Sequence, residues 1–250
     1  VGVTRKINGE DRLITFDSKA LGGGALAGFM SFRENELNTF QNKIGLMAAK
    51  LGETVNALQQ SGVDLQGVKG LDLFKFGDPS NLPADFARVN PNAYNSKSNP
   101  VDLNLSTLNL SKVTGDDFEI LMTTGGAGAK PQYRIAGSGA DFKDVPVDGS
   151  GKFFIPDAAG NSVLSFGFSG ALNASNVGDR FTVMPTRDAA RNIAMNVSRP
   201  ELVAAASASD PSSGNNEVIL SVAKLRSEGM LYQNFSTRGV SITEAFNQMV

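Results

Sequence analysis

The longest regular pattern of apolar positions lies between residues 25 and 61. Apolar residues recur there at steps of three, four and seven, which places them on one stripe of an α-helix. The other positions are mostly Asn, Gln, Glu, Lys and Ala, and Gly62 follows as a residue suited to the left-handed conformation that ends helices. The pattern predicts one helix of about 36 residues, roughly 54 Å long at 1.5 Å per residue.

A helix of this length needs a packing partner, because its apolar stripe repeats at the spacing of packed helix pairs for about three heptads. We expect the stripe to pack against other helices of the same chain, and docking against another chain is the less common alternative. The predicted helix packing stripe consists of Leu37, Phe40, Ile44, Met47, Leu51, Val55 and Leu58.

Shorter elements are predicted at both ends of the chain. Residues 1–20 alternate weakly around the turn at Asn8-Gly9, which indicates a hairpin or a single strand. Short helices are predicted at residues 186–194, 200–206 and 216–227, and a new helical pattern starts at Thr243. These helices are the candidates to lie against the long one.

The middle of the chain has a different character, rich in Gly, Ser, Thr and Asn with short alternating runs. Strands are predicted near residues 101–110, 118–123, 132–136, 152–155, 162–168 and 180–184. Short strands at near-regular spacing are typical of a small sandwich or barrel. We therefore predict an α+β protein in which residues 1–80 plus 186–250 form a helical trunk domain, a bundle around the long helix with a short N-terminal hairpin. Residues 81–185 form an inserted β domain, all-β and sandwich- or barrel-like.

Composition excludes several classes of function. Of the 250 residues, 41% are hydrophobic and 19% charged, which is typical of a folded globular chain. Lys and Arg number 23 against 25 for Asp and Glu, so the net charge of −2 offers no basic field for nucleic acid. The absence of Cys, His and Trp removes thiol and imidazole catalysis, disulfides and nearly every zinc site. No run of apolar residues is long enough for a membrane span, and no signal peptide is visible.

Three motifs suggest chemistry, and each has a simpler interpretation. The run Gly22-Gly23-Gly24-Ala25-Leu26-Ala27 fits a dinucleotide-binding turn, but the helix after it is too long for a crossover helix. Lys130 lies in a glycine-rich run without the phosphate-loop spacing, and Asp116, Asp117 and Glu119 lie on a strand whose neighbours face opposite ways. We expect no catalytic, cofactor-binding or metal-binding residues, and no cofactor.

Several strings resemble the flagellar hook-associated protein 1 family. Residues 23–38 read GGALAGFMSFRENELN, which is similar to the pattern G-G-x-L-x-G-L-L-x-F-R-x-x-x-L of that family. Residues 62–67 and 70–74 follow at matching distances, and residues 178–192, GDRFTVMPTRDAARN, resemble the return from the family's β domain to its helical trunk. Order and spacing agree over roughly residues 12–78 and 178–235.

The resemblance implies a structural, non-enzymatic subunit at the junction between flagellar hook and filament. It implies as partners other copies of itself in a ring, the hook protein and the second junction protein. A flagellar export chaperone is implied through a terminus outside this chain. It also implies an extracellular place on the bacterial flagellum, reached by type III export without a cleaved signal peptide. The chain begins at Val1 and ends within a helical pattern, so we expect a fragment lacking both terminal assembly regions, and a monomeric one.

Two further interpretations stay open from the sequence. One is another flagellar axial subunit, either the second junction protein or a flagellin-like protein. The other is a surface-exposed module whose β domain binds a host receptor or glycan, although Tyr133 is the only Tyr between residues 101 and 185. Neither nucleic acid nor a membrane is expected as a partner.

Overall fold

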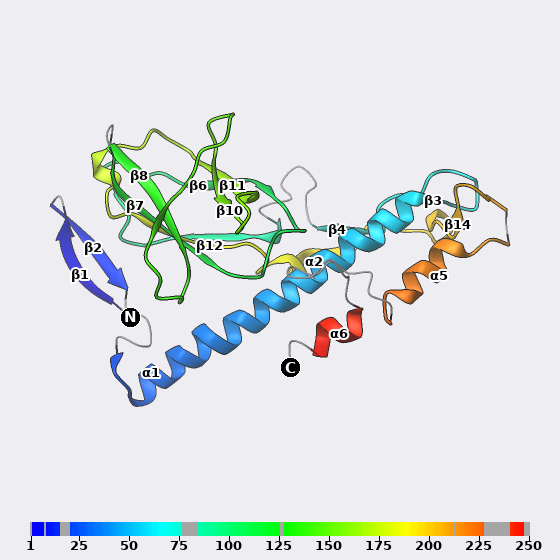
Figure 1. The fold of residues 1–250 in the computed structure, drawn as a ribbon, viewed down its shortest axis with the longest axis horizontal. Coiled ribbons are helices and arrows are strands. Elements are labelled where there is room, and N and C mark those ends of the chain that lie inside the picture. The colour runs from blue at the N-terminus through cyan, green and yellow to red at the C-terminus, as the bar shows by residue number, and fades with distance from the viewer. Residues whose placement is uncertain are drawn as a thin grey trace. The chain divides into compact units, whose positions relative to one another are not determined.

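A computed structural model of the chain describes residues 2–7, 9–15, 21–76, 85–125, 128–212, 214–227 and 241–247. The chain divides into two compact units (Figure 1). Unit 1 comprises Val1–Asn42 and Ala87–Pro185, and unit 2 comprises Lys43–Phe86 and Thr186–Val250. The predicted division into a trunk of residues 1–80 plus 186–250 and an inserted domain of residues 81–185 stays a prediction.

One long helix forms where the apolar pattern predicted it, and Figure 1 shows it as a continuous ribbon from α1 through α2. It consists of α1 (Gly24–Ser31), a π-helical segment (Phe32–Leu37) and α2 (Asn38–Ser61), which together span 38 residues. The π-helical segment was not predicted. The predicted left-handed stop at Gly62 is wrong, because Gly62 begins strand β3 (Gly62–Val63).

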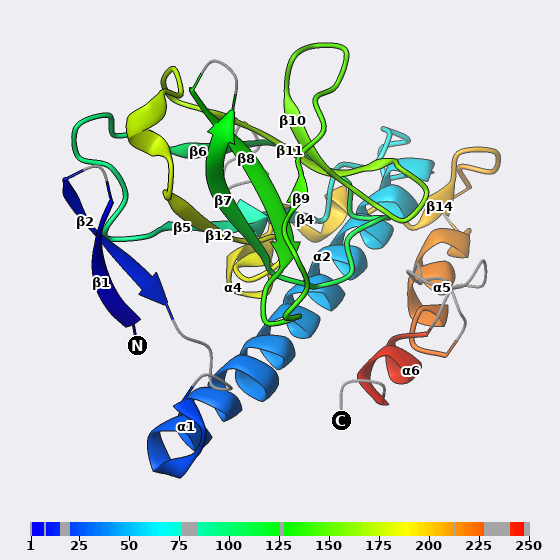
Figure 2. The same ribbon diagram turned by 60° about the vertical axis from the view of Figure 1, so that its left-hand side comes forward.

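The described strands of unit 1 form three antiparallel sheets. A hairpin at the N-terminus pairs β1 (Gly2–Ile7) with β2 (Glu10–Thr15) in a register from Gly2↔Thr15 to Ile7↔Glu10. The larger sheets have the orders β5-β12-β7-β8-β9 and β10-β11-β6, and no sheet of the described strands closes into a barrel (Figure 2). Their strands are β5 (Arg88–Pro91), β6 (Leu103–Leu108), β7 (Phe118–Gly125), β8 (Gly128–Ile135), β9 (Lys143–Asp144), β10 (Phe153–Pro156), β11 (Ser162–Phe168) and β12 (Arg180–Met184).

One hydrophobic core joins the two larger sheets. On β7, Phe118, Ile120 and Met122 are buried while the residues between them are only half-buried, as the period of two in a strand requires. Phe166 of β11 and Phe181 of β12 belong to the same buried cluster, so both sheets contribute side chains to it. The mixed α+β class is therefore confirmed, with a sandwich-like β core.

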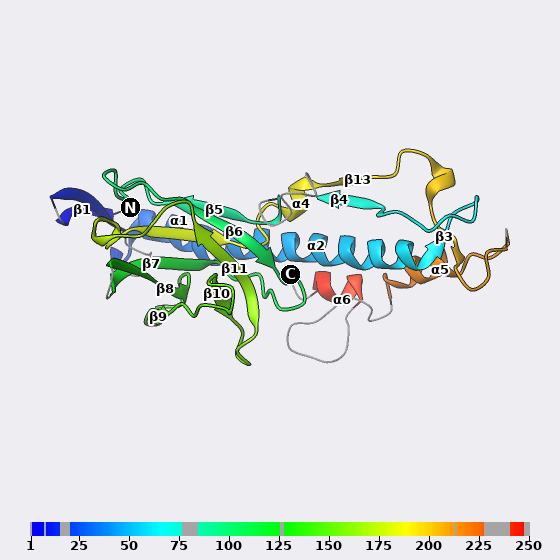
Figure 3. The same ribbon diagram turned by 90° about the horizontal axis from the view of Figure 1, so that it is seen from above.

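Unit 2 consists of short elements around α2. Strand β3 pairs with β14 (Ala206–Ser207). Strand β4 (Phe74–Phe76) pairs with β13 (Ile193–Met195), and Figure 3 shows these two strands side by side. The predicted helix at residues 186–194 shrinks to α4 (Ala189–Asn192), and residues 200–206 begin with a 3₁₀ turn (Pro200–Leu202). Helix α5 (Glu217–Lys224) forms inside the predicted segment 216–227, and α6 (Ile242–Asn247) begins one residue before the predicted start at Thr243.

Candidate packing surfaces of the long helix

The predicted packing stripe has mixed burial. Val55 is buried, with 3% of its surface exposed, whereas Leu37 and Phe40 are 43% and 42% exposed. The stripe's remaining members are half-buried, namely Ile44, Met47, Leu51 and Leu58. The stripe as a packing surface stays a prediction.

The most deeply buried face of α2 in unit 2 consists of small residues. Gly45, Ala49 and Gly52 are buried and lie at steps of four and three, on one side of the helix. A Cβ at Gly45 would clash with the backbone carbonyl oxygen of Thr186, and one at Gly52 would clash with the ring of Phe76. Glycine at these positions lets the neighbouring segments approach the helix backbone closely.

Two amide side chains continue this face toward the end of the helix. Asn56 donates from Nδ2 to the Phe74 carbonyl oxygen at 2.8 Å and accepts from the Phe74 N–H at 2.9 Å. Gln59 makes the same pair of hydrogen bonds with Ala204. Its Nε2 donates to the Ala204 carbonyl oxygen at 3.1 Å, and its Oε1 accepts from the Ala204 N–H at 2.9 Å. Each amide thus satisfies both backbone groups of one residue in an extended segment, as a neighbouring strand would.

Lys50 and Glu53 are the perturbed charged pair of this helix. Lys50 is only 5% exposed, and burial lowers its pKa, an effect that the charge of Glu53 opposes. Burial raises the pKa of Glu53, and the charge of Lys50 opposes that shift. Their opposite charges at i and i+3 partly compensate the cost of burial.

The pattern of large apolar residues does not reveal this face, because its residues are small or carry amide groups. The residues that sequence reasoning missed are Gly45, Ala49 and Gly52 together with Asn56 and Gln59, all of which lie outside the predicted apolar stripe. The signal was present, because small and amide residues also repeat here at steps of three and four. At the unit 1 end of α2, Asn42 donates from Nδ2 to Asp117 Oδ1 at 2.8 Å.

The residues considered for chemistry have structural roles. Lys130 pairs with Asp144 at 2.9 Å, and Glu119 pairs with Arg134 at 2.6 Å. Within the described ranges, no cluster of three acidic residues could hold a metal ion, and no helix is long and apolar enough to cross a membrane. The glycine run at 22–24 forms the turn that leads into α1.

Tyr133, the aromatic residue that a glycan-binding module would use, packs against the buried cluster of the β sandwich. Burial raises the pKa of its hydroxyl group. Its ring therefore contributes to the core on one side and is not a free platform for a sugar.

Comparison with known sequences gives one consistent picture. A profile described as the flagellar hook-associated protein FlgK helical domain matches residues 4–74. Flagellar hook-associated protein 1 of Escherichia coli strain K12 is 26% identical over 213 residues, which are 84% of this chain and 34% of that protein. Flagellar hook-associated protein 1 of Salmonella typhimurium strain LT2 is 30% identical over 108 residues, 43% of this chain and 18% of that protein.

A solved structure is similar as well. The flagellar hook junction protein FlgK from Burkholderia pseudomallei superimposes with a TM-score of 0.54 at 27% sequence identity, covering 74% of this chain and 30% of that chain. The chain thus spans about a third of the length of the Escherichia coli relative and of the Burkholderia chain.

Proposed function

Because the chain belongs to the flagellar hook-associated protein 1 family, we propose that it is part of a structural adaptor subunit at the junction between flagellar hook and filament. The proposal is supported by a likeness that extends over most of the chain, in sequence and in structure. The subunit works by assembly and not by catalysis.

The long helix provides the mechanical part of this function. A tubular assembly needs stiff elements, and the continuous helix of 38 residues is one, with a rise of about 1.5 Å per residue in its α-helical parts. The contacts of Asn56 and Gln59 attach extended segments to its far end through paired hydrogen bonds. We propose that the half-exposed packing stripe meets further helices in the assembled protein.

The proposed partners are other copies of the subunit in a ring, the hook protein and the second junction protein, with an export chaperone that binds outside this chain. The place of action is the extracellular flagellum, reached without a cleaved signal peptide. Ring contacts between identical subunits are head-to-tail, and individually weak contacts add up around the assembly.

The test is removal of the gene for the full-length protein, followed by electron microscopy of the cells and an assay for flagellin in the medium. We expect hooks without filaments and flagellin released from the cells. Re-expression of the full-length protein is the control and should restore filaments. Normal filaments in the deletion strain would contradict the proposal.

A further inference from the structure

The outer face of the five-stranded sheet carries a row of polar side chains across four strands. Asn90 on β5 lies opposite Thr182 on β12, Thr182 lies opposite Glu119 on β7, and Glu119 lies opposite Arg134 on β8. Arg180 precedes Thr182 by two residues and shares this face. Neighbouring residues on the same strands point into the core, so this row is the side of the sheet away from it.

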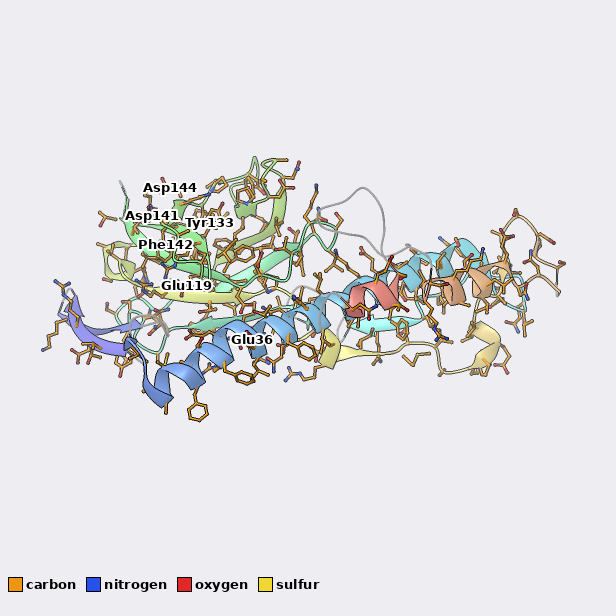
Figure 4. The ribbon with its side chains drawn as sticks, turned by 60° about the horizontal axis from the view of Figure 1, so that its bottom comes forward. Glu36, Glu119, Tyr133, Asp141, Phe142 and Asp144 are labelled. Atoms are coloured by element: carbon orange, nitrogen blue, oxygen red, sulfur yellow. The ribbon has the colours of Figure 1, made fainter. Side chains whose placement is uncertain are left out.

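The row contains two guanidinium groups and one carboxylate. Arg134 binds Glu119 through Nε at 2.6 Å, and its guanidinium carbon lies 4.5 Å from the centre of the Phe142 ring. The Arg180 guanidinium carbon lies 5.8 Å from the centre of the same ring. Figure 4 shows Glu119 and Phe142 close together on this part of the sheet. The carboxylate of Glu119 forms an ion pair with Arg134, so this row of side chains carries one net positive charge, at Arg180.

Arg180 is the member of this row whose guanidinium group has no hydrogen-bond acceptor among the described residues. Its pKa is lowered by burial, which the charge of Glu119 opposes and the charge of Arg134 reinforces. Within the part of the chain that the structure describes, its guanidinium group makes no hydrogen bond or ion pair. A half-buried guanidinium group with five donors and no acceptor is costly, because burial removes water without supplying a replacement.

A hollow of about 210 Å³ opens beside Arg180. The side chains of Asn90 and Thr182 line it, and among the described residues they too make no hydrogen bond through their polar side-chain atoms. Ile120 and Phe181 contribute backbone, since their side chains are buried in the core. The hollow is lined by Asn90, Pro91, Asn92, Glu119, Ile120, Arg180, Phe181 and Thr182.

These features specify the chemistry of the occupant. A carboxylate accepts two parallel hydrogen bonds from a guanidinium group, and Asn90 and Thr182 supply further donors. The carboxylate of Asp144, on β9 at the edge of the same sheet, already binds Lys130 and Gln132. Sites for whole small molecules usually measure about 300–1,000 Å³ and have mainly apolar walls, so this hollow suits one acidic side chain.

We propose that the hollow beside Arg180, the Arg180 pocket, binds the carboxylate group of an Asp or Glu side chain presented by another protein chain. Such a contact brings a second carboxylate to the group formed by Arg134, Glu119 and Arg180. The remainder of the partner is held by its own contacts, and the pocket fixes its position by recognising one anionic group.

The test is a nuclear magnetic resonance titration of the 250-residue chain that follows the arginine Nε–H signals. The probe is the blocked peptide N-acetyl-Gly-Glu-Gly-amide, and N-acetyl-Gly-Gln-Gly-amide is its uncharged match. We expect the Glu peptide to shift the Arg180 signal saturably and the Gln peptide to leave it in place. Arg180→Gln should weaken binding of the Glu peptide at least about tenfold, whereas Arg199→Gln, at an exposed site, should not change it.

A second variant keeps the test valid if Arg180→Gln disturbs the fold. Thr182→Val keeps the shape of the side chain and removes only the hydroxyl donor, so binding should weaken about threefold. The proposal is overturned if the Glu peptide leaves the Arg180 signal unmoved or if both peptides shift it equally. It is also overturned if sodium acetate shifts the signal and the Glu peptide does not, since the pocket would then admit only a free acid.

Discussion

At the scale of single residues, Asp179 shows how the β sandwich secures its loops. The side chain is 1% exposed, and it accepts hydrogen bonds from the Ser96 N–H at 2.7 Å and from Asn176 Nδ2 at 2.8 Å. Asp179→Ala removes the acceptor of the Ser96 N–H and of one hydrogen of Asn176 Nδ2, whose other hydrogen bond, to the Asn99 carbonyl oxygen, remains. Each buried N–H that loses its acceptor costs about 1–3 kcal/mol. We therefore expect the variant to lower the free energy of unfolding by at least about 2 kcal/mol, measured by urea denaturation.

The control for this prediction is Asp141→Ala, because Asp141 is exposed and in the same unit. Its effect should stay within about 0.5 kcal/mol of zero. Equal midpoints for the two variants would mean that the buried hydrogen bonds of Asp179 contribute nothing to stability.

Asp157 makes stability depend on pH. Hydrogen bonds from the Asn161 side chain and backbone hold its pKa at about 2, below the usual 3.8. Because the folded state binds the proton less tightly than the unfolded state, the stabilisation is present above pH 3.8 and is lost as the pH falls through about 2. The side chain of the variant Asp157→Asn cannot titrate. The difference in free energy of unfolding between the natural chain and this variant should therefore narrow as the pH falls from 3.8 to about 2. Urea unfolding of both proteins at a series of pH values measures this difference. A difference that does not change with pH would contradict the prediction.

At the scale of elements, the two helical glycines Gly45 and Gly28 should respond oppositely to the same change. Gly45→Ala places a methyl group against the Thr186 carbonyl oxygen and should destabilise the chain by about 1–3 kcal/mol. Gly28 is exposed with no atom within 4 Å of an added Cβ, so Gly28→Ala should stabilise the helix by up to about 1 kcal/mol. Thermal unfolding followed by circular dichroism measures both variants. Effects of the same sign would contradict the close approach at Gly45.

The packing stripe gives a second prediction at this scale. Val55→Ala removes buried methyl groups and should cost about 2 kcal/mol, because each buried methylene contributes about 0.8 kcal/mol and a cavity remains. Leu37→Ala should cost less than about 1 kcal/mol in the isolated chain, since 43% of Leu37 is exposed. Urea denaturation measures both variants. If Leu37→Ala lowers the free energy of unfolding more than Val55→Ala does, Leu37 is not the less buried residue of the two.

The elements differ in how far the sequence predicts them. The long helix and the strands β7, β11 and β12 follow from periodicity, because apolar spacing alone distinguishes them. Strands β4 and β13 do not, because they are three residues long and form only where Gly52 and Asn56 let them approach α2. The Arg180 pocket could not be predicted either, since it depends on the register that aligns four strands.

At the scale of the whole molecule, the exposed apolar side chains indicate how the chain behaves alone. Leu26, Phe29 and Phe32 are 55%, 75% and 61% exposed, and they lie close together in sequence at the start of the long helix. Three side chains on about two helix turns cover far less than the roughly 1,200 Å² of total buried surface that stable interfaces need. Contacts of that size hold subunits together only when many of them act at once.

We therefore expect the 250-residue chain to sediment as a single species of 26.3 kDa at micromolar concentration. Analytical ultracentrifugation over a hundredfold range of concentration tests this. A mass that rises with concentration would show that the chain assembles without further segments. Phe29→Ser is then the informative variant, because it removes the most exposed of the large apolar side chains among the described residues. Association that survives this change would locate the interface away from the start of the helix.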